Sequence, residues 1–241
     1  MKIIALISGK GGVGKTTLTA NIGIALAMLG RRTLVIDTDA GLRNLDIALG
    51  IQDSIVYDFH DVIKGYCKPK DALMTVNGVN GLSFLAAPQT AMTIPLELSS
   101  TLTLYEDDYD YILLDCPGGI SHGYEVIADR IIIVATPEFM SARDSDKAAE
   151  RAEDRGANNI NLIINKIDRK LMLSGKMLNI EEIVNIIAVP LIGVVPYERS
   201  VVHTNNRGRP AILDKKSRVG MACMNIAMRI DGKKVKILKD I

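Results

Sequence analysis

Residues 8–17 read SGKGGVGKTT, and this segment restricts the fold of the chain more than any other. The pattern G-x-x-x-x-G-K-[ST] runs from Gly9 to Thr16, after the apolar run of residues 3–7 and before a stretch of helical character at residues 18–29. A strand, a glycine-rich loop and a helix in this order form a phosphate-binding unit. The glycines let backbone N–H groups approach an anion closely, and the helix N-terminus adds positive potential. The segment therefore predicts a nucleotide site.

Two side chains of this loop have separate tasks. Lys15 is expected to reach the β- and γ-phosphates, and the hydroxyl of Thr16 is expected to ligate Mg²⁺. The residues expected to surround the nucleotide phosphates are Gly11, Gly12, Val13, Gly14, Lys15, Thr16 and Thr17.

Composition and charge limit the alternatives. The 241 residues fit one α/β domain or two small ones, and 48% of them are hydrophobic, which is ample for a sizeable core. The formal net charge is +1, so global electrostatics predict no nucleic-acid partner. The three cysteines form no C-x-x-C pair, which argues against zinc and suits a reducing cytoplasm. The apolar stretch at residues 186–196 is too short to span a bilayer.

Short apolar runs alternate with helical stretches along the whole chain. Several runs are apolar on both faces, which is typical of parallel strands covered by helices on each side. The predicted strands are residues 3–7, 33–36, 82–86, 111–114, 130–135, 161–164 and 191–195. The predicted helices include residues 17–29, 95–105, 141–155, 180–187 and 215–229. We therefore expect a single-domain, doubly wound α/β fold with a mostly parallel sheet, helices on both faces, and ligands at the carboxyl ends of the strands.

Acidic residues follow two of the predicted strands. Asp37 and Asp39 come after residues 33–36, while Asp115 follows residues 111–114 and precedes Cys-Pro-Gly-Gly. An aspartate in this position is suited to hold the metal of a nucleotide through water. A lone aspartate at a strand end is usually a turn or helix-cap residue. The phosphate loop nevertheless favours the metal role for Asp115.

Lys10 is a second lysine inside the phosphate loop, and Lys15 repels it unless negative charge accumulates nearby. Two placements would stabilise it: on the phosphates of its own nucleotide, or across a dimer on those of the partner. In the second placement it would act as an arginine finger does and neutralise charge that develops in the transition state. The residues alone leave both placements open.

The run of residues 10–17, KGGVGKTT, resembles the deviant phosphate loop of the ParA/MinD family of ATPases, in which the first lysine is the family signature. Other blocks resemble the MinD-like branch of that family, namely residues 37–46, 56–59, 62–63, 143–146, 191–196, 200–201 and 205–210. The resemblance covers about residues 1–230. It predicts one ATPase domain over residues 1–230 and a short basic tail at residues 231–241.

The resemblance implies roles for residues that spacing alone does not assign. Asp39 would orient the attacking water and act in catalysis with Lys10 and Lys15. Asp37 would lie near Mg²⁺, which Asp115 would also help to hold. Asn44 and Asp46 would belong to a switch that senses the γ-phosphate, Asn165 would read adenine, and Pro196 would pack on the base. The implied surface for protein partners consists of Arg143, Asp144 and Asp146.

The resemblance also implies a cycle with ATP and Mg²⁺ as cofactors. ATP would dimerise the protein, and the dimer would bind the anionic inner surface of the cell membrane and regulate septum placement. A MinE-like activator would trigger hydrolysis, which is slow without it, and return the protein to the cytoplasm. A MinC-like septation inhibitor would compete for the same partner surface.

Three features leave alternatives. Residues 165–168 read NKID, which matches the guanine reader of GTPases and would make Asp168 a guanine ligand. A ParA-like partition ATPase or a flagellar-number regulator could share the phosphate loop and act as a nucleotide-gated scaffold. In the tail, Val235, Leu238 and Ile241 would share one face of a helix that targets a membrane, but the same residues also fit a frayed tail or a short edge strand.

Overall fold

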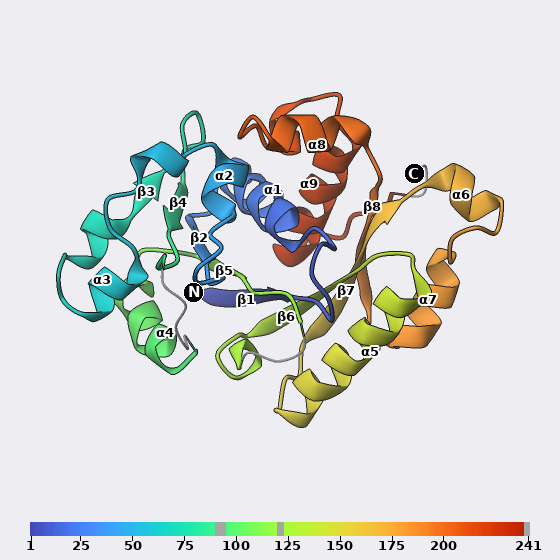
Figure 1. The fold of residues 1–241 in the computed structure, drawn as a ribbon, viewed down its shortest axis with the longest axis horizontal. Helices are drawn as coiled ribbons and strands as arrows, with labels where there is room; N and C mark the ends of the chain where they lie inside the picture. Colours follow the sequence, from blue (N-terminus) through green and yellow to red (C-terminus); the bar gives the residue numbers. More distant parts are fainter. Residues whose placement is uncertain (90–94, 120–122, 239–241) are drawn as a thin grey trace.

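The computed structural model describes residues 1–89, 95–119 and 123–238, and these residues form one eight-stranded sheet in the order β3-β4-β2-β5-β1-β6-β7-β8 (Figure 1). The strands are β1 (Lys2–Ile7), β2 (Thr33–Asp37), β3 (Met74–Thr75), β4 (Leu82–Leu85), β5 (Tyr111–Asp115), β6 (Arg130–Ala135), β7 (Ile160–Ile167) and β8 (Leu191–Pro196). All neighbours pair in parallel except β3 and β4, which are antiparallel. The expected doubly wound fold is confirmed.

Helices cover both faces of the sheet. Side chains of α1 (Lys15–Met28), α2 (Leu45–Leu49) and α9 (Arg218–Ile230) enter one hydrophobic core, and those of α3 (Phe59–Ile63), α4 (Pro95–Leu102), α5 (Phe139–Asp154) and α7 (Ile180–Ile187) enter the other. The described part also contains α6 (Arg169–Leu173) and α8 (Arg199–Asn205).

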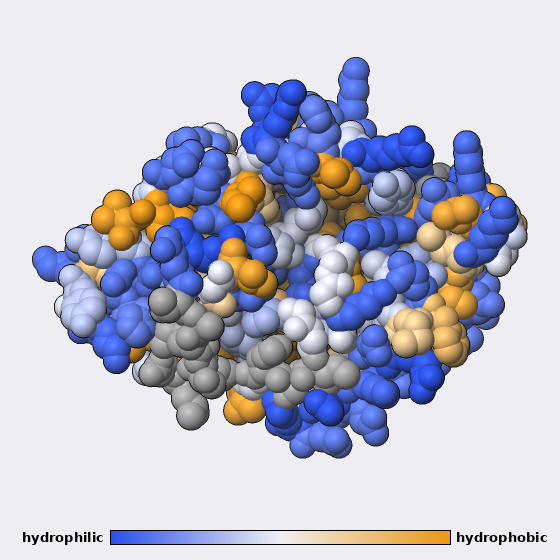
Figure 2. Space-filling view, viewed as in Figure 1, coloured by the Kyte–Doolittle hydropathy of each residue, from blue (hydrophilic) through white to orange (hydrophobic). Residues whose placement is uncertain are grey.

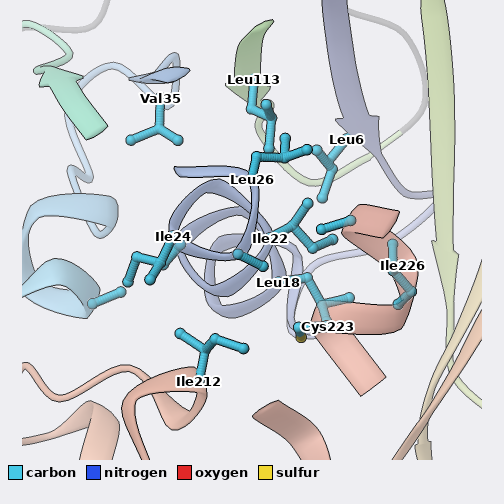
Figure 3. Close-up of a cluster of buried hydrophobic side chains, with 14 of the residues drawn as sticks. Leu6, Leu18, Ile22, Ile24, Leu26, Val35, Leu113, Ile212, Cys223 and Ile226 are labelled. Atoms are coloured by element: carbon cyan, nitrogen blue, oxygen red, sulfur yellow. The ribbon is translucent and has the colours of Figure 1, made fainter. Parts of the chain in front are cut away.

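The alternation of side chains along the central strand divides the two cores. In β1, Ile4 and Leu6 enter the core under α1, whereas Ala5 and Ile7 enter the core under α5. Figure 3 shows α1 within the first core, with Leu6 and Leu113 on one side and Ile212, Cys223 and Ile226 on the other. Helix α1 is therefore buried on nearly all sides, and the phosphate loop that precedes it is anchored to the centre of the fold.

The predicted elements are found with shifted ends. Helix α5 begins two residues before the expected 141, and α9 begins at Arg218 rather than 215, because Ser217 caps it by accepting a hydrogen bond from the Gly220 N–H. Strand β7 runs past the expected 164 to Ile167. The sequence did not predict the two-residue strand β3 or the short helices α2, α3, α6 and α8.

The start of the tail packs back onto the domain. Residues 233–238 are not helical, the guanidinium of Arg229 donates to the carbonyl of Val235, and Ile237 and Leu238 contact the cores. Of the alternatives for the tail, the helix with Val235 and Leu238 on one face is not formed as far as residue 238, and its third member, Ile241, lies outside the described residues. No helix of the described residues is both long and apolar enough to cross a membrane. Figure 2 shows only small, separate apolar patches on the face that it displays.

We predict that Gly193→Ala in β8 lowers the free energy of unfolding by about 1–3 kcal/mol through overpacking. A Cβ at Gly193 would lie 2.3 Å from Cγ1 of Ile226 in α9, so one of the two elements must move. Ile226→Ala alone creates a cavity and is also destabilising, but it should make room for the new methyl group. Urea unfolding of both single variants and the double variant tests this, and strictly additive losses would contradict the predicted contact.

Candidate nucleotide-binding site

A cavity of about 650 Å³ opens at the carboxyl ends of β1, β2, β5, β7 and β8. Of the predicted site residues, it is lined by Gly11, Gly12, Gly14, Lys15, Thr16, Thr17, Asp39, Asn44, Asn165 and Pro196. Other lining residues include Cys116, Gly118, Lys166 and residues of α8. The position agrees with the rule that doubly wound sheets bind ligands beyond the carboxyl ends of their strands.

The ammonium of Lys15 is held in place before any phosphate arrives. Its Nζ donates to Oγ of Ser8 over 2.8 Å, and that hydroxyl donates in turn to the carbonyl of Lys10 over 2.7 Å. Burial lowers the pKa of Lys15, while the carboxylate of Asp115 acts in the opposite direction. A desolvated cation gains strongly from an anionic ligand, so this position favours phosphate binding.

Two buried carboxylates lie side by side next to Lys15. Strands β2 and β5 pair so that Asp37 stands opposite Asp115. Burial raises the pKa of Asp115 to about 7, and the neighbouring charge of Asp37 contributes in the same direction.

The hydroxyl of Thr19 lies 3.2 Å from Oδ1 of Asp115, and Thr16 also forms a hydrogen bond with this carboxyl group. A hydroxyl and a carboxylate in contact are the hard oxygen ligands that Mg²⁺ uses with water and nucleotide phosphates, so Thr16 and Asp115 fit this ion. When bound, Mg²⁺ neutralises the charge of the phosphates.

The carboxylate of Asp37 organises the loop that follows β2. It accepts hydrogen bonds from the N–H groups of Asp39 at 2.9 Å and of Asn44 and Leu45 at 3.0 Å each. Burial raises the pKa of Asp37 to about 6, against the effect of these N–H donors. Both Asp37 oxygens are thus used by the backbone, which makes this residue primarily a support for the loop in this structure.

The loop after β2 brings only some of the predicted switch residues to the cavity. Asp39 and Asn44 line it. Asp46 is buried in α2 and accepts hydrogen bonds from Arg43 and from the N–H of Ile47, and it is not among the lining residues. Any contribution of Asp46 to nucleotide sensing therefore passes through the loop.

Lys10 forms an ion pair with Glu138 of the same chain, with Nζ 2.5 Å from Oε2. Glu138 is the residue immediately before α5. The next residues of that helix include the predicted partner surface, on which Arg143 and Asp146 are exposed and Asp144 is half-buried. Lys10 thus lies toward α5, and both placements inferred from the sequence remain expectations.

The glycines of the loop allow backbone to approach backbone. A Cβ on Gly9 would lie 2.2 Å from the carbonyl oxygen of Asp144 in α5. A Cβ on Gly118, in the loop after β5, would lie 2.8 Å from Cα of Gly11. The phosphate loop is therefore in direct contact with α5 on one side and with the loop that follows Asp115 on the other.

The NKID segment divides between two tasks. Asn165 lines the cavity, and its Nδ2 donates to the carbonyl of Val13 over 2.8 Å. Asp168 instead caps α6 by accepting hydrogen bonds from the N–H groups of Lys170 and Leu171, and it does not line the cavity. This geometry disfavours the guanine-reading alternative, because the carboxylate that would bind guanine is occupied by the helix.

Five residues with contacts at the site were not predicted from the sequence. These are Ser8, Thr19, Glu138, Lys166 and Asn205, whose Nδ2 lies 2.9 Å from Oγ1 of Thr17. Ser8 directly precedes the loop pattern, so its position in the sequence could have indicated that it lies at the site. The other four become visible only when distant parts of the chain are brought together.

Comparisons with known proteins agree with this geometry. Residues 4–211 match the family described as the CobQ/CobB/MinD/ParA nucleotide binding domain. The septum site-determining protein MinD of Bacillus subtilis is 39% identical over 97% of this chain and 90% of its own length. A putative septum site-determining protein MinD of Emiliania huxleyi is 40% identical over 98% of this chain and 90% of its own length.

Solved structures give the same result. The MinC:MinD cell division protein complex of Aquifex aeolicus contains a chain with a TM-score of 0.92 and 38% identity, with 99% of both chains covered. MinD of Pyrococcus horikoshii complexed with Mg-ADP has a TM-score of 0.83 and 29% identity, over 95% of this chain and 96% of that one. The nucleotide-binding family and the Mg-ADP of the Pyrococcus horikoshii protein support the expected ATP and Mg²⁺, and the chain belongs to the MinD/ParA family of nucleotide-binding ATPases, within its septum site-determining MinD branch.

Proposed function

We propose that this septum-site ATPase acts as a membrane-associated dimer that ATP assembles and hydrolysis releases. The observation that carries the proposal is the place of Lys10, which lies in the phosphate loop yet is ion-paired with Glu138. Lys15 already supplies the cation expected at the protomer's own β- and γ-phosphates. The ammonium of a second lysine is stabilised most by the negative charge of a second triphosphate. A dimer across this edge of the sheet would supply that triphosphate.

Catalysis in this proposal uses Lys10, Lys15 and Asp39. Lys15 binds the phosphates of its own protomer, and Lys10 neutralises transition-state charge on the partner's nucleotide. Asp39 lines the cavity beside Lys15, where a carboxylate can orient an attacking water. Thr16 and Asp115 hold Mg²⁺, with Asp37 shaping the loop that carries Asp39. Asn165 and Pro196 form the adenine side of the cavity.

The exposed face of α5 is the proposed surface for protein partners. A MinC-like septation inhibitor is supported by the MinC:MinD complex of Aquifex aeolicus, which contains a chain similar to this one. A MinE-like activator that stimulates hydrolysis would compete for Arg143, Asp144 and Asp146. The net charge of +1 gives no global attraction to nucleic acid, which is not an expected partner.

Membrane association is proposed to depend on the basic tail at residues 231–241. A short basic segment with few apolar residues anchors weakly by itself, and a dimer doubles the anchors, which raises the overall affinity. The protein would then cycle between the cytoplasm and the inner face of the cell membrane. A ParA-like or flagellar-number scaffold role is less well supported, because the relatives at 39% and 40% identity are septum site-determining MinD proteins.

We predict that Asp39→Ala is a dimer with ATP and a monomer with ADP, because the variant binds the triphosphate but hydrolyses it slowly. Adding Lys10→Ala should return the protein to a monomer with ATP. Lys147→Ala, which removes an exposed lysine from α5, is the matched control and should leave the dimer intact. Size-exclusion chromatography with light scattering gives the mass of each, and a size that does not depend on nucleotide would refute the switch.

We expect at least tenfold tighter binding of ATP than of GTP, measured by calorimetry. Asp168→Ala should leave this ratio unchanged, because the carboxylate caps α6, and should cost about 1 kcal/mol of stability in urea unfolding. Asp214→Ala, which removes an exposed carboxylate elsewhere in the chain, controls for the change in charge. A preference for GTP that Asp168→Ala abolishes would reverse the assignment.

ATP should increase the fraction of protein that sediments with liposomes containing anionic lipid, relative to ADP. Lys10→Ala should remove the increase, since it prevents two tails from acting together. Removal of residues 233–241 should abolish sedimentation while leaving ATP-dependent dimerisation unchanged. Equal sedimentation with ATP, with ADP and with Lys10→Ala would count decisively against this mode of membrane binding.

A further inference from the structure

Two consecutive residues at the end of β7 bind two consecutive carbonyls of the phosphate loop. Asn165 donates from Nδ2 to the carbonyl of Val13 over 2.8 Å, and Lys166 donates from Nζ to the carbonyl of Gly12 over 2.7 Å. Both residues line the nucleotide cavity. In Figure 1 the dark-blue loop between β1 and α1 passes near β7, which is separated from β1 in the sheet by β6.

A distortion of β7 makes this double contact feasible. Successive side chains of a regular strand point to opposite faces, so neighbours cannot normally reach the same loop. Here the pairing of β7 with β8 changes register between Ile164 and Ile167, and Lys166 adopts the left-handed conformation with φ of 62°. A lysine rarely adopts this conformation, and such residues persist where the surroundings compensate for the strain, often at functional sites.

The two bonds control the orientation of specific peptide units. The carbonyl of Gly12 belongs to the same peptide unit as the N–H of Val13, and the carbonyl of Val13 to the same unit as the N–H of Gly14. Turning both carbonyls toward β7 fixes the direction of these N–H groups, which a phosphate loop needs to point at the anion. Gly14 is part of this fit, because a Cβ there would lie 2.4 Å from Nδ2 of Asn165.

We infer that Lys166 is a positioning residue for the nucleotide phosphates, and that it acts through the backbone of the loop rather than by touching the ligand. Together with Asn165, it holds the peptide units between Gly12 and Gly14 in the orientation that binds phosphate. Lys15 supplies the ammonium that meets the β- and γ-phosphates, so Lys166 adds orientation to a site that already has its cation.

This role predicts equal effects on di- and triphosphate. The N–H groups of such a loop cradle the α- and β-phosphates, which ADP and ATP share. Lys166→Met keeps the aliphatic stem and removes the donor, so the dissociation constants of Mg-ADP and of a non-hydrolysable Mg-ATP analogue should both rise roughly tenfold, as expected for loss of a charge-assisted hydrogen bond. Lys166→Arg keeps a donor and should restore most of the affinity. Lys170→Met, an exposed lysine of α6, has the same change in charge and should bind both nucleotides normally.

Lys166→Gly separates strain from binding. Glycine adopts a φ of 62° without strain, so this variant should unfold at a higher urea concentration than Lys166→Met while binding both nucleotides as weakly. Calorimetry and urea unfolding of the four variants form the test. Normal binding of both nucleotides by Lys166→Met and Lys166→Gly would overturn the inference, and so would a loss confined to the triphosphate analogue, since that result would place the ammonium on the γ-phosphate.

Discussion

The buried ammonium of Lys15 is the interaction on which the architecture of the site depends. Removing a lysine side chain from water is costly unless hydrogen bonds and an opposite charge compensate. Ser8 supplies the hydrogen bond and Asp115 the charge, and both are placed by strands at the centre of the sheet. The parallel pairing of β1 with β5, in which Leu6 stands opposite Asp115, brings these groups together at one edge.

The neighbouring pair of β2 and β5 adds a second charged feature. Asp37 and Asp115 are adjacent, burial raises the pKa of both, and the charge of Asp37 raises the pKa of Asp115 further. A divalent cation beside them reverses this effect, because it favours the ionised carboxylates. Since Asp37 also holds the N–H groups of Asp39 and Asn44, the shape of the loop after β2 is linked to the charge at the metal position.

The sequence predicted the sheet well because its strands are buried on both faces and therefore read as continuous apolar runs. It did not predict β3, which has two residues and lies at the edge, or helices of five to seven residues, which are too short for a periodic pattern. The end of β7 was missed because Asn165 and Lys166 are polar, and the strand continues through them only by means of a bulge.

The site residues also divide into those that a local sequence pattern predicts and those that it does not. Lys15, Thr16 and Asp115 follow from a local pattern whose chemistry is known, and the structure brings them together. Glu138 and Lys166 are 128 and 154 residues away from the groups they contact, so no local pattern could reveal them. Asp46 illustrates the opposite case, because its place in the motif suggested a sensor, whereas its carboxylate is turned toward Arg43.

The first turns of helix α5 contact the phosphate loop on one side and carry the exposed Arg143 on the other. Gly9 rests on the backbone of Asp144, and Lys10 is tied to Glu138, within the same first turns that carry Arg143 and Asp146. A helix is stiff over so short a length because every turn is braced by its own hydrogen bonds. A displacement of these turns from the outside is therefore transmitted directly to the start of the phosphate loop, because no flexible segment lies between them.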